Sequence, residues 1–329
     1  MNNTLKPETF GHYAHQAINK HFQKSVKPEA AVLKDEHPEP LHEMRVGMRR
    51  LRTALQVFSP AIVLPKAASV KRISKIARSL GQVRDLDVMH AELKTRYRYN
   101  LNKAEKVKLD ALLESLQQRR RHEFVQLEKT LSSHRYLKFK KVFENWLAQP
   151  VYQEVAELPI LEVLPDLLLP LVSELLLHPG WLMGTTVQEG QITLNQEISP
   201  QALSDQLEQQ GEVLHRLRKQ MKRVRYQTEF FIDFYSPSYA ALSQEFQTIQ
   251  KILGQIQDSF VLGEYLGAQL KDDLAHELPR LVAQMQQERV RVWQDWQPIQ
   301  QRYLDQEFRQ SLRSQVITPL APTLNLEEA

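Results

Sequence analysis

Residues 41–58 and 214–231 carry nearly the same sequence, and this repetition limits the possible folds more than any other feature of the chain. The two segments read LHEMRVGMRRLRTALQVF and LHRLRKQMKRVRYQTEFF, and they align without gaps. A second pair, SLGQVRDLD at 79–87 and ILGQIQDSF at 252–260, has the same offset of 173 residues, the distance from 41 to 214. This period is far too long for a solenoid. We therefore predict a duplicated unit that forms two similar helical bundles with a pseudo-twofold relation.

Composition favours helices throughout the chain. Only 10 of the 329 residues are glycine, whereas the helix formers leucine, glutamine, glutamate, arginine and alanine are plentiful. Apolar spacing and proline positions predict helices over residues 8–25, 39–58, 66–98, 103–131, 134–148, 160–178, 200–235, 237–272 and 276–313. We therefore predict an all-α protein with a first half at 1–150, a second half at 151–315 and a flexible tail at 316–329.

Other segments restrict the class of protein further. Residues 185–199, TTVQEGQITLNQEIS, alternate β-branched residues around a Glu-Gly pair, which predicts a small hairpin or a loop. The most apolar stretch, 158–183, is interrupted by acids and prolines and is interpreted as a buried helix instead of a membrane span. The absence of cysteine excludes disulfides and thiolate metal sites. The N-terminal MNNTLKPETFGHY lacks the apolar core of a secretory signal, so we expect a cytoplasmic protein.

The repeated segment has two adjacent stripes when it is placed on a helix. The apolar stripe consists of Leu41, Met44, Met48, Leu51, Leu55 and Phe58. The basic stripe beside it consists of His42, Arg45, Arg49 and Arg52 in the first copy, and of His215, Arg218, Lys222 and Arg225 in the second. Like charges at this spacing cost roughly 0.2–0.5 kcal/mol per pair, and few nearby acids offset them. This pattern indicates an anionic ligand, because the planar arginine fork binds phosphate through two parallel hydrogen bonds.

The Leu-Gly-x-x-Arg-Asp element is the second repeated feature. Gly81 falls within a helical pattern, where glycine costs about 1 kcal/mol relative to alanine, and its recurrence as Gly254 indicates a close approach between helices. Asp85 and Asp258 recur as well, and an aspartate in a basic site can hold an arginine or a histidine in position. Three further cations precede the element at helical spacing, Lys71, Lys75 and Arg78.

These motifs resemble, in the same order, the signature of the CHAD family, the conserved histidine α-helical domain. The motifs are His-x-x-Arg-x-x-x-Arg-Arg-x-Arg at 42–52, Leu-Gly-x-x-Arg-Asp-x-Asp at 80–87 and His-x-x-Arg-x-x-x-Lys-Arg-x-Arg-Tyr at 215–226. The resemblance covers roughly residues 5–315. It implies two four-helix-bundle-like halves around a basic central groove that binds inorganic polyphosphate, and association with polyphosphate granules.

The resemblance also has two limits. The family often occurs beside a β-rich CYTH domain that processes triphosphates, and no part of this chain fits such a domain, so we expect a stand-alone member. The second half departs from the motif at Gln257, where the first half has Arg84. Equal contributions of the two halves to ligand binding are therefore not expected.

The resulting hypothesis is a non-enzymatic polyphosphate-binding protein without a cofactor or a protein-bound metal. The candidate ligands of polyphosphate are His42, Arg45, Arg49, Arg50, Arg52, Lys71, Lys75, Arg78, Arg84, His215, Arg218, Lys219, Lys222, Arg223, Arg225 and Tyr226. Asp85 and Asp258 are the candidate orienting residues. Divalent cations can accompany the bound polyanion.

Two other functions remain open at this point. Nucleic-acid binding fits the basic sequence, but the basic stripes lack aromatic residues for base stacking apart from Tyr226. A metal-dependent hydrolase of phosphate chains would need an acidic cluster, and few acids accompany the stripes. Metal binding by His12, His15 and His21, or by His42 with His215, is a weaker alternative, because no zinc motif surrounds these histidines. The basic cluster at 119–122 is interpreted as a solvated face.

Overall fold

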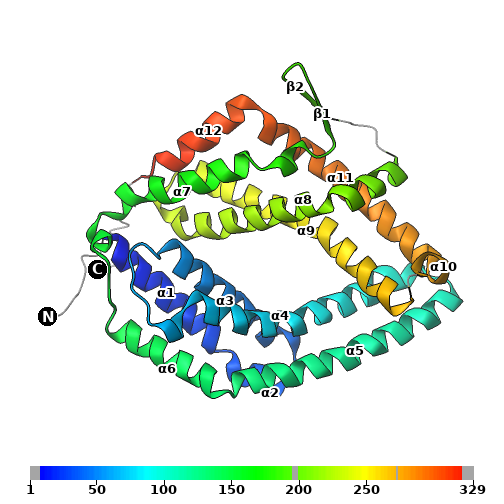
Figure 1. Ribbon diagram of the computed structural model, residues 1–329, viewed down its shortest axis with the longest axis horizontal. Helices are drawn as coiled ribbons and strands as arrows, with labels where there is room; N and C mark the ends of the chain where they lie inside the picture. The colour runs from blue at the N-terminus through cyan, green and yellow to red at the C-terminus, as the bar shows by residue number, and fades with distance from the viewer. Residues whose placement is uncertain (1–7, 195–198, 272, 321–329) are drawn as a thin grey trace. The chain divides into compact units, whose positions relative to one another are not determined.

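The computed structural model describes residues 8–194, 199–271 and 273–320, and it confirms the predicted all-α class (Figure 1). The chain divides into two compact units, which are treated separately below. The first comprises Met1–Tyr99 and Lys106–Val163, and the second comprises Asn100–Glu105 and Leu164–Ala329. The duplication and the pseudo-twofold relation remain predictions.

The first unit is built mainly from long helices joined by short turns. Its helices are α1 (Phe10–Val26), α2 (Glu29–Lys34), α3 (Pro38–Val57), α4 (Val70–Glu92), α5 (Lys103–Leu131) and α6 (His134–Ala148). A π-helical turn at Leu93–Tyr97 extends α4, and 3-10 turns lie at Lys66–Ala68, Arg98–Asn100 and Glu154–Glu157. The first residues of α5, Lys103–Glu105, belong to the second unit.

The second unit adds one small hairpin to its helices. Its helices are α7 (Ile160–Leu176, of which the first residues belong to the first unit), α8 (Pro200–Thr228), α9 (Pro237–Gln269), α10 (Leu274–Glu277), α11 (Pro279–Leu304) and α12 (Gln306–Ile317). The 3-10 turns lie at Pro179–Leu182 and Glu229–Phe234. The strands are β1 (Thr185–Gln188) and β2 (Gln191–Leu194).

The hairpin confirms the strand alternative for 185–194, while residues 195–198 of that prediction lie outside the described part of the chain. Strands β1 and β2 pair antiparallel, with Thr185 opposite Leu194. The two residues between them, Glu189 and Gly190, have φ angles of 49° and 80°. Two successive positive φ angles are what a tight two-residue hairpin turn requires, and glycine at the second position adopts this conformation without strain.

Local capping explains where the structure departs from the predicted helices. The helix predicted at 276–313 is divided, because the Asp305 side chain accepts a hydrogen bond from the Phe308 backbone N–H at 2.8 Å and starts α12. The helix α2 was not predicted, because Lys27-Pro28 was interpreted only as the end of α1. Pro28 instead occupies the N-cap of α2, and Asp35 ends α2 in the left-handed conformation at φ 52°.

The apolar stripes of the repeated segment form much of the core of each unit. In α3 the side chains of Leu41, Met44, Met48, Leu51 and Leu55 are buried, as are Leu214, Leu217, Met221 and Val224 in α8. The basic stripe of each helix therefore lies at the edge of a packed face. This packing fixes the direction in which the cations point.

Aromatic rings complete both cores. In the first unit Phe22 of α1 stacks on Phe143 of α6 with the ring centroids 4.9 Å apart. In the second unit the Trp181 ring stacks on Trp296 and on Tyr303, at centroid distances of 5.1 and 4.5 Å. Such pairs add favourable contact energy to the burial of their large apolar surfaces.

The apolar stretch at 158–183 is part of this core, as predicted. Within α7 the side chains of Leu164, Leu168, Val172 and Leu175 have no exposed surface. None of the helices in the described part of the chain has the length and hydropathy that a bilayer crossing requires.

At Gly47 the backbones of α1 and α3 approach each other closely. A Cβ atom at this position would lie 2.7 Å from the carbonyl carbon and oxygen of Lys24 and from the Cα of Ser25. These are backbone atoms, so neither helix can make room by turning a side chain. The alanine methyl group would force the two helices apart.

We predict that Gly47→Ala lowers the free energy of unfolding by about 2 kcal/mol, because overpacking outweighs the helix propensity gained from alanine. The matched control is Gly81→Ala in α4, whose Cβ would meet the Arg45 guanidinium at an ordinary 3.6 Å. Urea denaturation followed by circular dichroism measures both variants. Equal stability of the two would contradict the close contact.

His21 of α1 makes the stability of the first unit depend on pH. Burial, followed by the nearby cations Arg50, Lys20 and Lys24, lowers the pKa of His21 from 6.5 to about 4. The unfolded chain, with a histidine pKa of 6.5, therefore takes up a proton first as the pH falls. Stability is lost between pH 6.5 and about 4.

We expect this loss to be roughly 2 kcal/mol, once the partial solvent exposure of the ring is taken into account. The unfolding free energy of the wild type should be lower at pH 4.5 than at pH 7, and His21→Gln should remove the contribution of His21 to this difference. Urea denaturation at the two pH values measures it. His122→Gln, at an exposed position of α5, is the control and should keep the wild-type pH dependence. An unchanged pH dependence in His21→Gln would show that other groups cause it.

Candidate functional site

In the first unit an arginine of α3 lies against a glycine of α4. The Arg45 Nη1 donates to the Asp85 carboxylate at 2.6 Å and to the Gly81 carbonyl oxygen at 3.1 Å. A Cβ added to Gly81 would lie 3.6 Å from the guanidinium carbon of Arg45. The guanidinium thus lies over Gly81 of α4, and the aspartate one turn further along holds it there; we call this arrangement of arginine, glycine and aspartate the arginine seat.

The second unit repeats this arrangement with a longer ion pair. The Arg218 guanidinium of α8 lies over Gly254 of α9, with its Nε 3.6 Å from an added Cβ, and its Nη2 is 3.5 Å from Asp258. The Nε of Arg218 is buried without a hydrogen-bond partner in the described residues. The two repeated glycines were expected to mark a close approach of helices. In both units the neighbour is an arginine side chain, whereas the close backbone contact of the first unit is at Gly47.

His42 shows that cations of α3 and α4 gather around one imidazole. Burial lowers the pKa of His42 below its ordinary 6.5, and the positive charge of Arg84 on α4 lowers it further. Glu39 opposes the shift, and Arg49 and Arg45 add to it. The half-buried imidazole is therefore surrounded by arginines, which disfavour its protonation in the free protein.

The remaining candidates of the first unit differ in their exposure. Lys71, Lys75 and Arg78 are exposed, and helical spacing places them on one stripe of α4 with Asp85. Arg52 is half-buried, and its Nε is buried without a hydrogen-bond partner in the described residues. Arg50 is half-buried and lies close enough to His21 of α1 to lower its pKa. We call His42, Arg45, Arg49, Arg52, Lys71, Lys75, Arg78 and Arg84 the first cationic face.

In the second unit three candidates contact other parts of the same unit. Arg223 is exposed, and its Nη1 donates to Glu174 of α7 at 2.8 Å. Arg225 is largely buried and donates to Glu229 at 2.6 Å and to Gln250 at 3.2 Å. Tyr226 is only 4% exposed, and the Arg225 guanidinium lies over its ring. Buried or internally neutralised groups contribute little to the capture of a ligand from solvent.

Four other candidates remain at the surface of α8. His215 and Lys222 are half-buried, and Lys219 is exposed and 3.9 Å from Glu212. We call His215, Arg218, Lys219 and Lys222 the second cationic face. This face has fewer cations than the first. In the repeated Leu-Gly motif, Gln257 stands where the first half has Arg84.

Asp87, the last residue of the Leu-Gly-x-x-Arg-Asp-x-Asp element, does not join the first cationic face. It accepts a hydrogen bond at 2.9 Å from Arg120 of α5, which also binds both carboxylate oxygens of Asp35. These pairs raise the pKa of Arg120 and keep it charged. The interpretation of 119–122 as a solvated face is therefore wrong for Arg120, which joins α5 to α4 and to the end of α2. Spacing alone did not indicate this partner.

The histidines of α1 have partners within the protein. A ring nitrogen of His15 lies 2.9 Å from the Leu147 carbonyl oxygen, and one of His12 lies 2.7 Å from the Gln16 amide nitrogen. These contacts account for the i,i+3 spacing without a metal.

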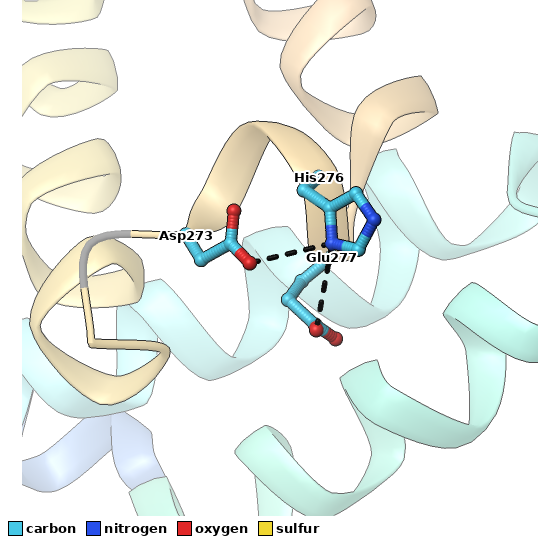
Figure 2. Close-up of side chains that lie close together, drawn as sticks. All are labelled: Asp273, His276 and Glu277. Atoms are coloured by element: carbon cyan, nitrogen blue, oxygen red, sulfur yellow. Dashed lines mark ion pairs between the residues drawn. The ribbon is translucent and has the colours of Figure 1, made fainter.

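One group with metal-ligating side chains was not anticipated from the sequence. Asp273, His276 and Glu277 place potential ligand atoms within 4.8 Å of one another around α10 (Figure 2). The His276 Nδ1 is 3.3 Å from Asp273 and 3.9 Å from Glu277. The donor types suit a divalent cation. However, the Asp273 and His276 side chains are largely exposed, and such ion pairs form at protein surfaces without a metal.

Comparisons with known proteins bear on the family and the fold. The family model described as "CHAD domain" matches residues 16–267. The crystal structure of the CHAD domain from the plant Ricinus communis has a TM-score of 0.57 and 23% sequence identity, and the match covers 97% of this chain and 96% of that one. PptA from Streptomyces chartreusis has a TM-score of 0.59 and 14% identity, with 88% of this chain and 99% of that one covered.

At these identities the two structures establish similarity of fold. No curated protein matches the chain. The family model, by contrast, spans well over half of the sequence and includes the repeated motifs from His42 to Asp258. On this basis the chain belongs to the CHAD domain family.

Proposed function

We propose that this protein binds inorganic polyphosphate through its two cationic faces and does not transform it chemically. The observation that carries the proposal is the arginine seat that each unit contains, in which an aspartate holds a guanidinium over a glycine, Arg45 in the first unit and Arg218 in the second. A guanidinium fixed in advance loses little conformational entropy when its other N–H groups bind a phosphate. Regularly spaced cations around each seat suit a ligand with regularly spaced negative charges.

The first cationic face is the stronger part of this proposal. It joins the α3 stripe to exposed cations of α4, and after burial, which is the larger cause, the charge of Arg84 also lowers the pKa of His42 there. Asp85 and Asp258 act as orienting residues. Arg50, Arg223, Arg225 and Tyr226 are left out of the proposed ligand set, because their positions direct them to other contacts. Binding of this kind would bring the protein to polyphosphate granules, and divalent cations would accompany the polymer.

Two alternatives have less support. Tyr226, the aromatic residue in the basic stripes, is buried, so it offers no surface for base stacking by a nucleic acid. Hydrolysis of phosphate chains would need carboxylates that hold a metal. The acids of the repeated Leu-Gly motif, Asp85, Asp258 and Asp87, are instead paired with arginines.

The main test removes Arg45, Arg49, Arg218 and Lys222 together by substitution with alanine. We expect wild-type affinity for polyphosphate to fall by roughly a hundredfold or more between about 50 and 200 mM salt, because binding releases counterions from the polymer. The variant should lose binding at all of these salt concentrations while its circular dichroism spectrum is unchanged. Fluorescence anisotropy of end-labelled polyphosphate measures both.

The control variant replaces Lys103, Lys129, Lys138 and Lys141, four exposed lysines outside the faces, so that the change in net charge is the same. It should keep most of the affinity. Excess double-stranded DNA should displace the probe poorly. If the fourfold alanine variant of the two faces bound polyphosphate as tightly as the wild type does, with the same salt dependence, the binding site would lie elsewhere.

A second test follows the protonation of His42. A bound phosphate adds negative charge among the arginines, so it should raise the pKa of His42 from its lowered value. By linkage, affinity for polyphosphate should increase as the pH falls below about 6.5. Imidazole NMR titrations with and without polyphosphate measure the shift, with exposed His122 as the internal reference. No change in the His42 titration upon saturation would remove this histidine from the proposed face.

A further inference from the structure

The second unit contains a pocket of about 520 Å³ whose chemistry differs from that of the cationic faces. The pocket lies between α8, α9 and α11, with Leu274 of α10 also in its wall. In Figure 1 these helices form the yellow-green to orange part of the ribbon. His215 is the one wall residue that the proposed function uses, although Gln257, Ser259 and Phe260 in the wall lie within the repeated segment at 252–260.

The charge in the wall of the pocket is mainly negative. Glu208 and Glu212 lie one turn apart on α8, and Glu264 faces the same pocket from α9. In the described part of the chain, neither Glu208 nor Glu264 has an ion-pair partner, and the cation nearest to Glu212 is Lys219 at 3.9 Å. The one arginine in the wall, Arg289, lies over the Phe260 ring and donates to the Met285 carbonyl oxygen. The pocket is therefore complementary to a cation.

Two buried polar atoms in the wall residues also need a hydrogen-bond partner. Ser259 is only 7% exposed, and within the described residues its Oγ makes no hydrogen bond. The Nδ1 of His215 is buried and has no partner either. Leaving such atoms unsatisfied costs free energy, which a ligand that donates N–H hydrogen bonds would recover once a side-chain rotation brings the atoms to the pocket surface. Both atoms can accept a hydrogen bond.

Apart from Gln257, the rest of the wall is apolar and leaves room for an aliphatic chain. Leu207, Val282 and Met285 line it together with Phe260. A Cβ added to Gly211 would meet no atom within 4 Å, so the space beside α8 is open. Aliphatic carbons placed here would gain from burial against these side chains.

The spacing of the acids favours an organic cation over a metal ion. Among the described residues, the one set of three metal-ligating side chains with converging ligand atoms is Asp273, His276 and Glu277. The carboxylates of Glu208, Glu212 and Glu264 do not converge in this way, whereas a metal needs its ligands close together. Separate carboxylates around an apolar wall suit a molecule with separate positive ends.

We propose that this pocket binds an aliphatic diamine or polyamine. Its ammonium groups lie at the glutamates of α8 and α9, and its methylene chain lies along Leu207, Phe260 and Met285. N–H donors of the ligand satisfy Ser259 and His215. The proposal does not depend on polyphosphate binding, because the acids that select the amine lie outside the second cationic face.

The test uses the full-length protein, washed at high salt to remove bound polyanions. Isothermal titration calorimetry compares three probes of the same length: 1,5-diaminopentane, pentane-1,5-diol and glutarate. We expect saturable binding of the diamine alone. Equal binding of the diol would show that charge does not select the ligand, and binding of glutarate in its place would overturn the proposal.

Two variants locate the diamine. The double variant Glu208→Gln and Glu264→Gln should weaken binding by about tenfold or more, since it removes two charge pairs and keeps the shape of the side chains. The matched control replaces Glu114 and Glu144, two exposed acids of the first unit, by glutamine and should bind as the wild type does. An equal loss in both double variants would indicate non-specific attraction to surface acids and would contradict the pocket.

The second variant, Gly211→Leu, fills the open space beside α8. It should abolish diamine binding without lowering the melting temperature, because leucine is the better helix former and meets no atom at its Cβ. It should also keep the polyphosphate affinity of the wild type, which separates failure of this proposal from failure of the proposed function. Undiminished binding of the diamine to this variant would place the amine outside the pocket.

Discussion

The seat of an arginine on a neighbouring helix is the interaction on which the rest of the proposed site depends. An arginine within a cationic stripe gains little by pointing into water, because its neighbours repel it. Here the guanidinium of Arg45 instead lies across Gly81 and bonds to Asp85, which joins α3 to α4. The contact joins the two helices, and under the proposed function it also fixes one of the cations near His42 for recognition of the ligand.

The core beneath explains why this seat keeps its geometry. The buried stripe of α3 prevents the helix from rotating, and Gly47 holds α3 directly against the backbone of α1. The basic stripe therefore emerges at a defined edge of the packed face. Acids that could have cancelled it are used elsewhere, since Asp87 and Asp35 both bind Arg120. These acids therefore neutralise Arg120, and the cations of the basic stripe remain at the surface.

Much of this could be predicted from the sequence, because it rests on local periodicity. The helix at 134–148 coincides with α6, and the two stripes lie as spacing indicates. Residues that commonly end helices were less informative. Pro28 follows α1, but it also occupies the N-cap position of α2. Contacts between residues far apart in the sequence could not be predicted. The sequence around Arg120 does not indicate that it pairs with Asp35, and the sequence around Gly47 does not indicate that it contacts Lys24. The pocket of the second unit joins residues from 207 to 289, and no single segment carries its pattern.

The ion pairs of Arg45 and Arg218 differ in length, and this difference bears on how the proposed ligand, polyphosphate, would be held. Arg45 is 2.6 Å from its carboxylate, whereas Arg218 is 3.5 Å from its own. An arginine in close contact with its acid gives up more when it turns toward a new anion. Under the proposed function, the first seat would act as a fixed anchor and the second would yield more readily. A chain of phosphates whose torsions vary along its length would be gripped firmly at one point and followed flexibly at the other.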